Sequence, residues 1–188
     1  MPFDFATTEI PGIYLITPGL FLDDRGFFME SWKKSEFQKS GINEDFVQDN
    51  HSFSSRGVLR GLHFQREPES QGKLVRVITG AVWDVAVDIR PDSGSFGKWY
   101  GTELNEENPQ MVYIPPGFAH GFLVLSDSAL FHYHCTTEYA PEFDAAIAWN
   151  DPDINVNWPI EPESVSTKDS AAPRLCDVPS ERLPGLAQ

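Results

Sequence analysis

Apolar and polar residues alternate along short stretches of this chain, and turn-forming residues separate the stretches about every ten positions. The fullest stretch is 74–89, which is rich in β-branched residues and is interrupted by Thr79-Gly80, a turn signal between two strands. Further strands are predicted at 13–16, 21–32, 46–53, 98–104, 111–114, 118–125 and 129–137. Eight or more short strands with little helix predict an all-β fold, a sandwich or barrel of the jelly-roll kind.

The ends of the chain predict less regular structure. Residues 35–40 indicate one or two helical turns that stop at Gly41. After Trp158-Pro159 the chain becomes rich in Pro, Glu, Ser and Ala, which favours irregular or short helical structure on the outside, with 179–188 loosely held. We therefore expect a single domain over 1–188, with a jelly-roll core at about 45–160, strands within 1–44 and short peripheral helices within 160–188.

Composition indicates the size of the core and the kind of compartment in which the protein works. A chain of 188 residues with 40% hydrophobic content can bury a sizeable core without metals or disulfides. The two cysteines, Cys135 and Cys176, lack CxxC spacing, which fits a reducing compartment. No leader pattern or membrane-length apolar run occurs, so we expect a cytoplasmic protein without a membrane partner.

Charge is unevenly distributed. The net charge is −14, and no Lys or Arg occurs between Tyr100 and Thr167, so most of the surface would repel nucleic acid polymers and anionic membranes. The stretch 56–90 nevertheless holds six of the fourteen Lys and Arg residues. It predicts either a site for a small anionic ligand such as a phosphate ester or ordinary placement of surface cations.

The strand that begins at Val82 carries two carboxylates. Alternation puts Asp84 and Asp88 on one face and Trp83, Val85, Val87 and Ile89 on the other. A face with two carboxylates is either solvated or part of a polar cavity, and periodicity does not distinguish the two.

Five histidines offer two kinds of chemistry: His51, His63, His120, His132 and His134. His132-x-His134 has the spacing of a metal-binding pair, because both side chains would share one face of a strand. Tyr133 would then face the other way, and no such pair surrounds His63. We therefore predict no functional metal.

Acid–base chemistry without a metal is the second interpretation. His63 suits a general base near neutral pH, Lys73 would stabilise an oxyanion, and Tyr133 would act as a phenolic acid. The second ring nitrogen of His63 needs a partner, which Asp84 or Asp169 would supply. Such a set suits proton abstraction next to a carbonyl.

Seven sequence strings together resemble one family, the dTDP-4-dehydrorhamnose 3,5-epimerases. The strings are DRGFFME at 24–30, VQDNHS at 47–52, GVLRGLHFQ at 57–65, QGKLVRV at 71–77, DVAVDIR at 84–90, IPPGFAHGF at 114–122 and WNDPD at 149–153. The match runs in order from about residue 8 to 175.

This resemblance implies a cupin-type jelly roll without metal or other cofactor, acting on dTDP-4-keto-6-deoxyglucose. By motif, His63 resembles the base beside the C4 ketone, Asp169 its orienting carboxylate, Lys73 the stabiliser of the enolate and Tyr133 the acid on the opposite face. The C4 ketone acidifies both C3 and C5, so the implied product is dTDP-4-keto-L-rhamnose. The family also implies a homodimer with its N-terminal strands at the interface.

Further residues resemble the family's substrate-binding set. Arg60 resembles the pyrophosphate ligand and Tyr139 a platform for thymine, while Arg25 and Glu30 would reach in from the second subunit. The remaining members of this set are Gln48, Asp49, Asn50, Asp84, His120, Asp144 and Lys168.

Two departures from the family keep alternatives open. His134 replaces a common Lys after Tyr133, and Phe143-Asp144-Ala145-Ala146 replaces a usual His-Glu-Arg-Gly. These changes could alter a contact with the sugar nucleotide or the setting of Tyr133, so an enzyme that inverts only C3, in an antibiotic deoxysugar pathway, is the first alternative. A non-catalytic nucleotide-sugar-binding cupin and a metal-dependent cupin oxygenase or isomerase are the others.

Overall fold

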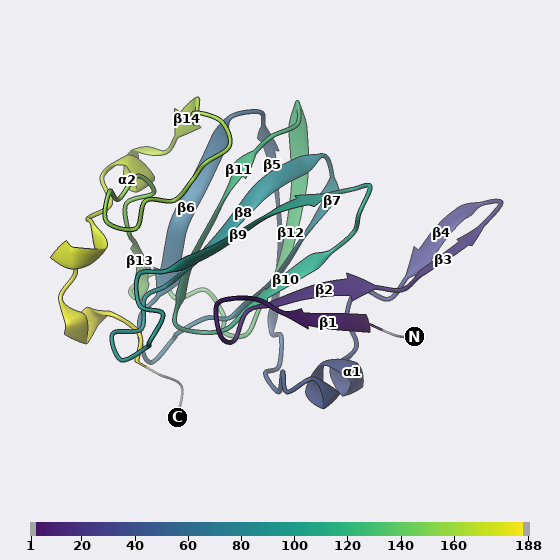
Figure 1. Ribbon diagram of the computed structural model, residues 1–188, viewed down its shortest axis with the longest axis horizontal. Helices are drawn as coiled ribbons and strands as arrows, with labels where there is room; N and C mark the ends of the chain where they lie inside the picture. The colour runs from purple at the N-terminus through teal and green to yellow at the C-terminus, as the bar shows by residue number, and fades with distance from the viewer. Residues whose placement is uncertain (1–2, 186–188) are drawn as a thin grey trace.

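Two six-stranded antiparallel-rich sheets face each other (Figure 1), and the computed structural model describes residues 3–185. The first sheet has the order β1 (Phe3–Thr7), β2 (Tyr14–Pro18), β10 (Met111–Ile114), β7 (Lys73–Thr79), β12 (Ser128–Cys135) and β5 (Gln48–Ser55). The second sheet has the order β13 (Asp144–Ala146), β6 (Val58–Gln65), β11 (Phe118–Val124), β8 (Ala81–Asp88) and β9 (Trp99–Asn105), with β14 (Ser164–Val165) beside β6. The predicted jelly roll is confirmed, and its sheets extend beyond residues 45–160 because β1, β2 and β14 belong to them.

The turn at Gly80 is a corner between the sheets. The strand β7 lies in the first sheet and β8 in the second, so the stretch 74–89 crosses from one wall to the other. Gly80 has φ +83°, and a Cβ there would lie 2.1 Å from the carbonyl oxygen of Ser128. Only glycine fits this corner without displacing the backbone.

Both faces of β8 are buried, including the face that carries Asp84 and Asp88. Val82 and Ala86 pack between the sheets, while Val85 and Val87 pack on the outer face under the C-terminal segment. Asp84 is 2% exposed, so the solvated alternative is wrong for this strand.

Asp88, at the end of the same strand, has a structural role. Its carboxylate accepts hydrogen bonds from Arg90 Nε at 2.8 Å, Ser93 Oγ at 2.5 Å and Ser95 Oγ at 2.6 Å. Burial alone would raise the pKa of Asp88, but these donors hold the pKa below its ordinary value. The network fixes the turn that follows β8.

The C-terminal segment forms the cover of the second sheet. It contains α2 (Thr167–Ser170) and two short 3₁₀ helices, η1 (Leu175–Asp177) and η2 (Ser180–Arg182). Leu175 and Leu183 are both buried against the sheet. The prediction that 179–188 is loosely held is therefore wrong as far as residue 185, because its apolar side chains complete a core, and 186–188 lie outside the described residues.

The N-terminal region contributes a projecting hairpin. The sequence predicts one strand at 21–32, but Gly26, with φ +125°, reverses the chain into β3 (Leu20–Asp23) and β4 (Gly26–Met29). The hairpin extends away from the two sheets (Figure 1), with Leu22 78% and Phe27 62% exposed. The helix α1 (Lys34–Lys39), predicted at 35–40, follows it and buries Phe37 on the outer face of the first sheet.

No helix within residues 3–185 is long and apolar enough to cross a membrane.

A close approach between β6 and β11 puts two histidines next to each other. His63 pairs with His120 across these strands, and a Cβ at Gly61 would lie 2.5 Å from the Cα of Gly121. Gly61 also has φ +122°, a conformation that other residues rarely adopt. The backbone of β6 near His63 therefore depends on glycine at position 61.

We expect Gly61→Ala to lower the free energy of unfolding by about 2–4 kcal/mol, because the new methyl group adds both backbone strain and overpacking. Chemical denaturation measures the loss. Gly94→Ala is the matched control, since a Cβ there meets nothing within 4 Å and φ is not in the left-handed region. Equal stability of the two variants would contradict this account of the strand crossing.

Candidate active site

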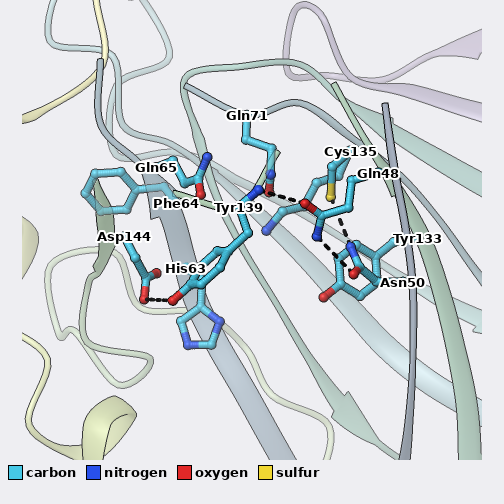
Figure 2. A pocket seen from close by; sticks show the side chains of 11 residues that line it. Gln48, Asn50, His63, Phe64, Gln65, Gln71, Tyr133, Cys135, Tyr139 and Asp144 are labelled. Carbon is cyan, nitrogen blue, oxygen red and sulfur yellow. Dashed lines mark hydrogen bonds between the residues drawn. The ribbon is translucent and has the colours of Figure 1, made fainter. Parts of the chain in front are cut away.

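A cavity opens between the two sheets and has two lobes. One lobe, of about 250 Å³, is drawn in Figure 2, and the other, of about 200 Å³, lies deeper along β11. His63, Lys73 and Tyr133 line both lobes, so the residues predicted to do chemistry lie where the lobes meet. His63 comes from the second sheet, and Lys73 and Tyr133 come from the first.

His63 is paired with Asp169. The two are joined by a hydrogen bond of 2.6 Å between Nε2 and Oδ1, and the backbone N–H of Gly61 donates to the other carboxylate oxygen at 3.4 Å. Burial by itself would raise the pKa of Asp169, but the hydrogen bond from His63 and the donor at Gly61 hold that pKa below its ordinary value. An ionised Asp169 accepts from Nε2–H of His63, which leaves Nδ1 free to take a proton.

The position of Asp169 comes from the capped turn of α2. The side chain of Ser166 accepts a hydrogen bond from the backbone N–H of Asp169 at 3.1 Å and starts the helix. Strand β14, just before it, pairs with β6, so the C-terminal segment is fastened to the strand that carries His63. Of the two carboxylates predicted as partners of His63, Asp169 is the one that bonds to it.

Lys73 and Tyr133 form the opposite wall. They lie on neighbouring strands, with the ammonium of Lys73 6.0 Å from the centre of the Tyr133 ring. Burial lowers the pKa of Lys73, and the acidic groups of Cys135 and Asp84 partly offset this effect. Burial also raises the pKa of Tyr133, so its phenol keeps its proton at neutral pH.

Asp84 belongs to a second pair, with His120. The bond between His120 Nε2 and Asp84 Oδ2 is 2.7 Å, and both side chains are buried. Burial lowers the pKa of His120, opposed by the Asp84 carboxylate, so a neutral imidazole faces the deeper lobe. Arg60 lines the same lobe, where its Nε donates to Ser54 Oγ at 3.0 Å.

A polar network surrounds the mouth of the cavity (Figure 2). The amide oxygen of Gln48 accepts from the backbone N–H of Tyr139 at 2.7 Å, and its amide nitrogen donates to Asn50 at 3.0 Å. The hydroxyl of Tyr139 donates to Asp144 Oδ2 at 3.1 Å. Lys168 makes an ion pair with the same carboxylate. Six predicted ligands of the sugar nucleotide are thereby brought together with the four predicted catalytic residues: Gln48, Asn50, Arg60, Tyr139, Asp144 and Lys168.

Three predicted site residues lie outside this cavity. Arg25 is on the turn of the β3–β4 hairpin, where it pairs with Asp23, and Glu30 follows β4 near Lys33. Asp49 is on β5 between Gln48 and Asn50, so its side chain points to the opposite face of the first sheet. There it contacts His132 and His134, which also face away from the cavity.

Two glutamines of the cavity wall are absent from the predicted set. Gln65 bonds to the carbonyl of Glu138 at 3.2 Å and the backbone N–H of Ala140 at 2.8 Å, and Gln71 donates to the carbonyl of Thr137 at 2.6 Å. Together they hold the segment that carries Tyr139. Their positions in the sequence could have identified them as cavity residues, because Gln65 shares a strand face with His63 and Gln71 lies two residues before Lys73.

The comparisons with known proteins agree with this geometry. A family model described as dTDP-4-dehydrorhamnose 3,5-epimerase matches residues 7–177. The chain belongs to this family. It is 58% identical over 153 residues to the dTDP-4-dehydrorhamnose 3,5-epimerase of Escherichia coli K12, covering 81% of this chain and 83% of the relative.

Solved structures extend the likeness to the whole chain. The epimerase of Legionella pneumophila, crystallised with dTDP-4-keto-L-rhamnose, has 45% identity and a TM-score of 0.96, with 100% of both chains covered. A 3′-monoepimerase of Streptomyces bikiniensis, crystallised with dTDP-quinovose, is less similar, at 34% identity and a TM-score of 0.87 over 95% of this chain and 91% of that one. The family thus includes enzymes described as inverting one centre and enzymes described as inverting two.

We expect Asp169→Asn to lower kcat by about 10²–10⁴-fold with little change in KM, because the amide neither holds His63 in the right tautomer nor stabilises its protonated form. Steady-state kinetics and thermal unfolding should be measured together. Ser166→Ala is the matched control, since it removes the cap of α2 and keeps the carboxylate. An unchanged kcat in the Asp169→Asn variant would remove this carboxylate from the mechanism.

Proposed function

We propose that the protein inverts C3 and C5 of dTDP-4-keto-6-deoxyglucose and releases dTDP-4-keto-L-rhamnose. The observation that carries the proposal is the placement of His63 and Tyr133 on opposite walls of one cavity, with Lys73 beside them. Inversion at carbon requires that a proton leave from one face and another arrive on the opposite face. A base and an acid from two facing sheets meet this requirement without a movement of either strand.

The reaction begins at His63. Its Nδ1 takes the proton from a carbon beside the C4 ketone, and the electron pair of the broken C–H bond moves onto the ketone oxygen. The imidazolium formed is stabilised by the ionised Asp169, which accepts from Nε2 at 2.6 Å. The enolate oxygen gains from Lys73, because a charged donor in a water-poor site stabilises developing charge by roughly 3–4 kcal/mol.

Tyr133 completes the inversion. Burial keeps its phenol protonated, and the phenol gives its proton to the same carbon from the other side. Exchange with solvent then restores Tyr133 and removes the proton from His63. The C4 ketone acidifies both neighbouring carbons, so a second cycle at the other carbon uses the same residues.

The nucleotide half of the substrate fits the cationic and aromatic groups around the cavity. Arg60, in the deeper lobe, suits the pyrophosphate, and Tyr139, which is 55% exposed at the mouth, suits stacking on thymine. Gln48 and Asn50 present amides beside Tyr139. In a protein of net charge −14, Arg60, Lys73 and Lys168 supply the local positive potential that a nucleotide sugar needs.

A homodimer completes this site. The β3–β4 hairpin exposes Phe21, Leu22, Phe27 and Phe28, and a two-stranded hairpin with this much apolar surface gains stability by packing on another molecule. Its turn carries Arg25, and Glu30 follows β4. In the proposed dimer, both reach the partner's cavity and add to its substrate contacts.

The two departures from the family pattern leave the double epimerisation intact. His134 faces away from the cavity, on the outer side of the first sheet. Asp144 bonds to Tyr139 and Lys168 rather than to Tyr133. The proposed effect of the Asp144 change is therefore on nucleotide binding, and the acid at Tyr133 remains available for both carbons.

We assign the reaction to the cytoplasm. Cys135 is buried and Cys176 is exposed, and both are free thiols, which suits a reducing compartment.

The proposed function is tested by proton NMR of dTDP-4-keto-6-deoxyglucose incubated with the protein in deuterium oxide, followed by reduction of the product. We expect deuterium at C3 and C5 and an L-configured product, because each inversion takes its new proton from solvent. Deuterium at C3 alone would identify a 3-epimerase. No exchange at either carbon would indicate a binding protein.

Two variants separate the base from the acid in the same experiment. With His63→Asn, exchange should stop at both carbons. With Tyr133→Phe, inversion should fall by at least about 100-fold while some exchange continues, because His63 can return a deuteron to the face from which it took the proton. Loss of exchange in both variants would contradict the assignment of Tyr133 as the acid.

The dimer is tested by mixing two inactive variants. One carries Arg25→Ala with Glu30→Ala, and the other carries His63→Asn. If the hairpin acts in the partner's cavity, random reassortment gives mixed dimers with one complete site, and roughly a quarter of the wild-type activity returns. If the hairpin serves its own cavity, the mixture stays as inactive as its components.

A further inference from the structure

Three potential metal ligands meet on the outer face of the first sheet. Among the residues that the structure describes, Asp49, His132 and His134 each offer one donor atom, and these atoms all lie within 4.8 Å of one another. Asp49 Oδ1 is 2.7 Å from His132 Nε2 and 3.6 Å from His134 Nδ1. Two imidazole nitrogens and one carboxylate oxygen form a donor set typical of divalent first-row transition metals.

We propose that Asp49, His132 and His134 bind a divalent transition metal ion such as Zn²⁺ or Co²⁺ on the back of the strands that line the substrate cavity. The sequence pattern predicts no functional metal, because Tyr133 faces away from the two histidines and no such pair surrounds His63. Pairing of β12 with β5 supplies the third ligand, since His134 lies directly across from Asp49.

The surroundings hold the two rings in place for this role. The imidazoles are perpendicular at 4.8 Å between their centres, and the ring of Phe46 packs on His134 at 5.8 Å.

One neighbour opposes the metal. The guanidinium of Arg76 lies on β7 next to His132, with Nε 3.5 Å from Nδ1 of that ring. Its charge repels a cation, and its donated hydrogen bond disfavours the tautomer in which Nε2 is free. We therefore expect affinity in the micromolar range, below that of sites without an adjacent cation.

The role of the ion is structural. Asp49 lies between Gln48 and Asn50, and the two histidines flank Tyr133 along the chain. Successive side chains of a strand point to opposite faces, so the proposed site and the substrate cavity share the same two strands from opposite sides. A bound ion would fasten the edge strand β5 to β12 without touching the substrate.

The test uses the full-length protein after removal of metal by a chelator. Titration with Co²⁺, followed by visible absorption, measures binding, and thermal unfolding with Zn²⁺ measures stabilisation. We expect one ion per chain and a rise in Tm of roughly 5–10 °C at a hundredfold excess over Kd. Turnover of the proposed substrate should persist without metal.

Matched variants locate the site. His134→Lys and the exposed, isosteric Asp49→Asn should each weaken Co²⁺ binding by at least about 100-fold. Arg76→Gln should strengthen binding about tenfold. The control is His51→Ala, because His51 lies across from His132 on the same face and outside the group of close donors, so its loss should change nothing.

Three results would overturn the proposal. They are absence of Co²⁺ binding to the wild-type protein, equal binding by wild type and Asp49→Asn, and loss of binding in His51→Ala. A fourth such result comes from a fifth variant, His63→Asn, which tests for binding at the cavity: loss of Co²⁺ binding in this variant would place the metal on the other face of the sheet.

Discussion

The hydrogen bond between Asp169 and His63 joins the last α-helix of the chain to a strand in the middle of the fold. It is short, at 2.6 Å, and the carboxylate that makes it is almost entirely buried. A charge in such a place is costly unless its hydrogen bonds are satisfied, and here an imidazole and a backbone N–H at Gly61 satisfy them. The cap at the start of α2 and the pairing of β14 with β6 together hold Asp169 next to His63.

Each of the two sheets forms one wall of the cavity, and the two walls carry groups with different chemical roles. The second sheet carries His63 and His120, and each imidazole is hydrogen-bonded to a carboxylate, that of Asp169 on α2 and that of Asp84 on β8. The first sheet carries Lys73 and Tyr133. Burial lowers the pKa of the Lys73 ammonium and raises the pKa of the Tyr133 phenol. Because the walls face each other, groups with opposite proton-transfer roles are held on opposite sides of whatever lies between them.

Much of this fold is predictable from the sequence, because alternation and turn residues are local signals. The strand limits at 111–114 and 118–125 and the helical turn at 35–40 agree with the structure to within about a residue. Alternation also predicts that Tyr133 faces away from His132 and His134. Alternation cannot show which face of a strand lines the cavity and which lies on the outside, because this depends on the partner strand and on what covers the sheet.

The incorrect predictions follow from that limit. The motif groups Asp49 with Gln48 and Asn50, although a neighbouring position on a strand points the other way. The hairpin at 20–29 resembles one strand because its turn, around Gly26, is short and its flanks are equally apolar. The choice between Asp84 and Asp169 as the partner of His63 is not an error but was open from the residues alone, because it depends on a contact that spans much of the chain.

That contact has a consequence for how the protein becomes competent during its synthesis. Asp169 follows His63 by 106 positions, and the strand and cap that position it lie within a few residues before it. Both facing sheets, apart from β14, are complete in sequence by residue 146, so a nascent chain of that length already contains both walls of the cavity. The base acquires its orienting charge only when the C-terminal segment has left the ribosome, so both walls of the cavity precede the completed base in the order of synthesis.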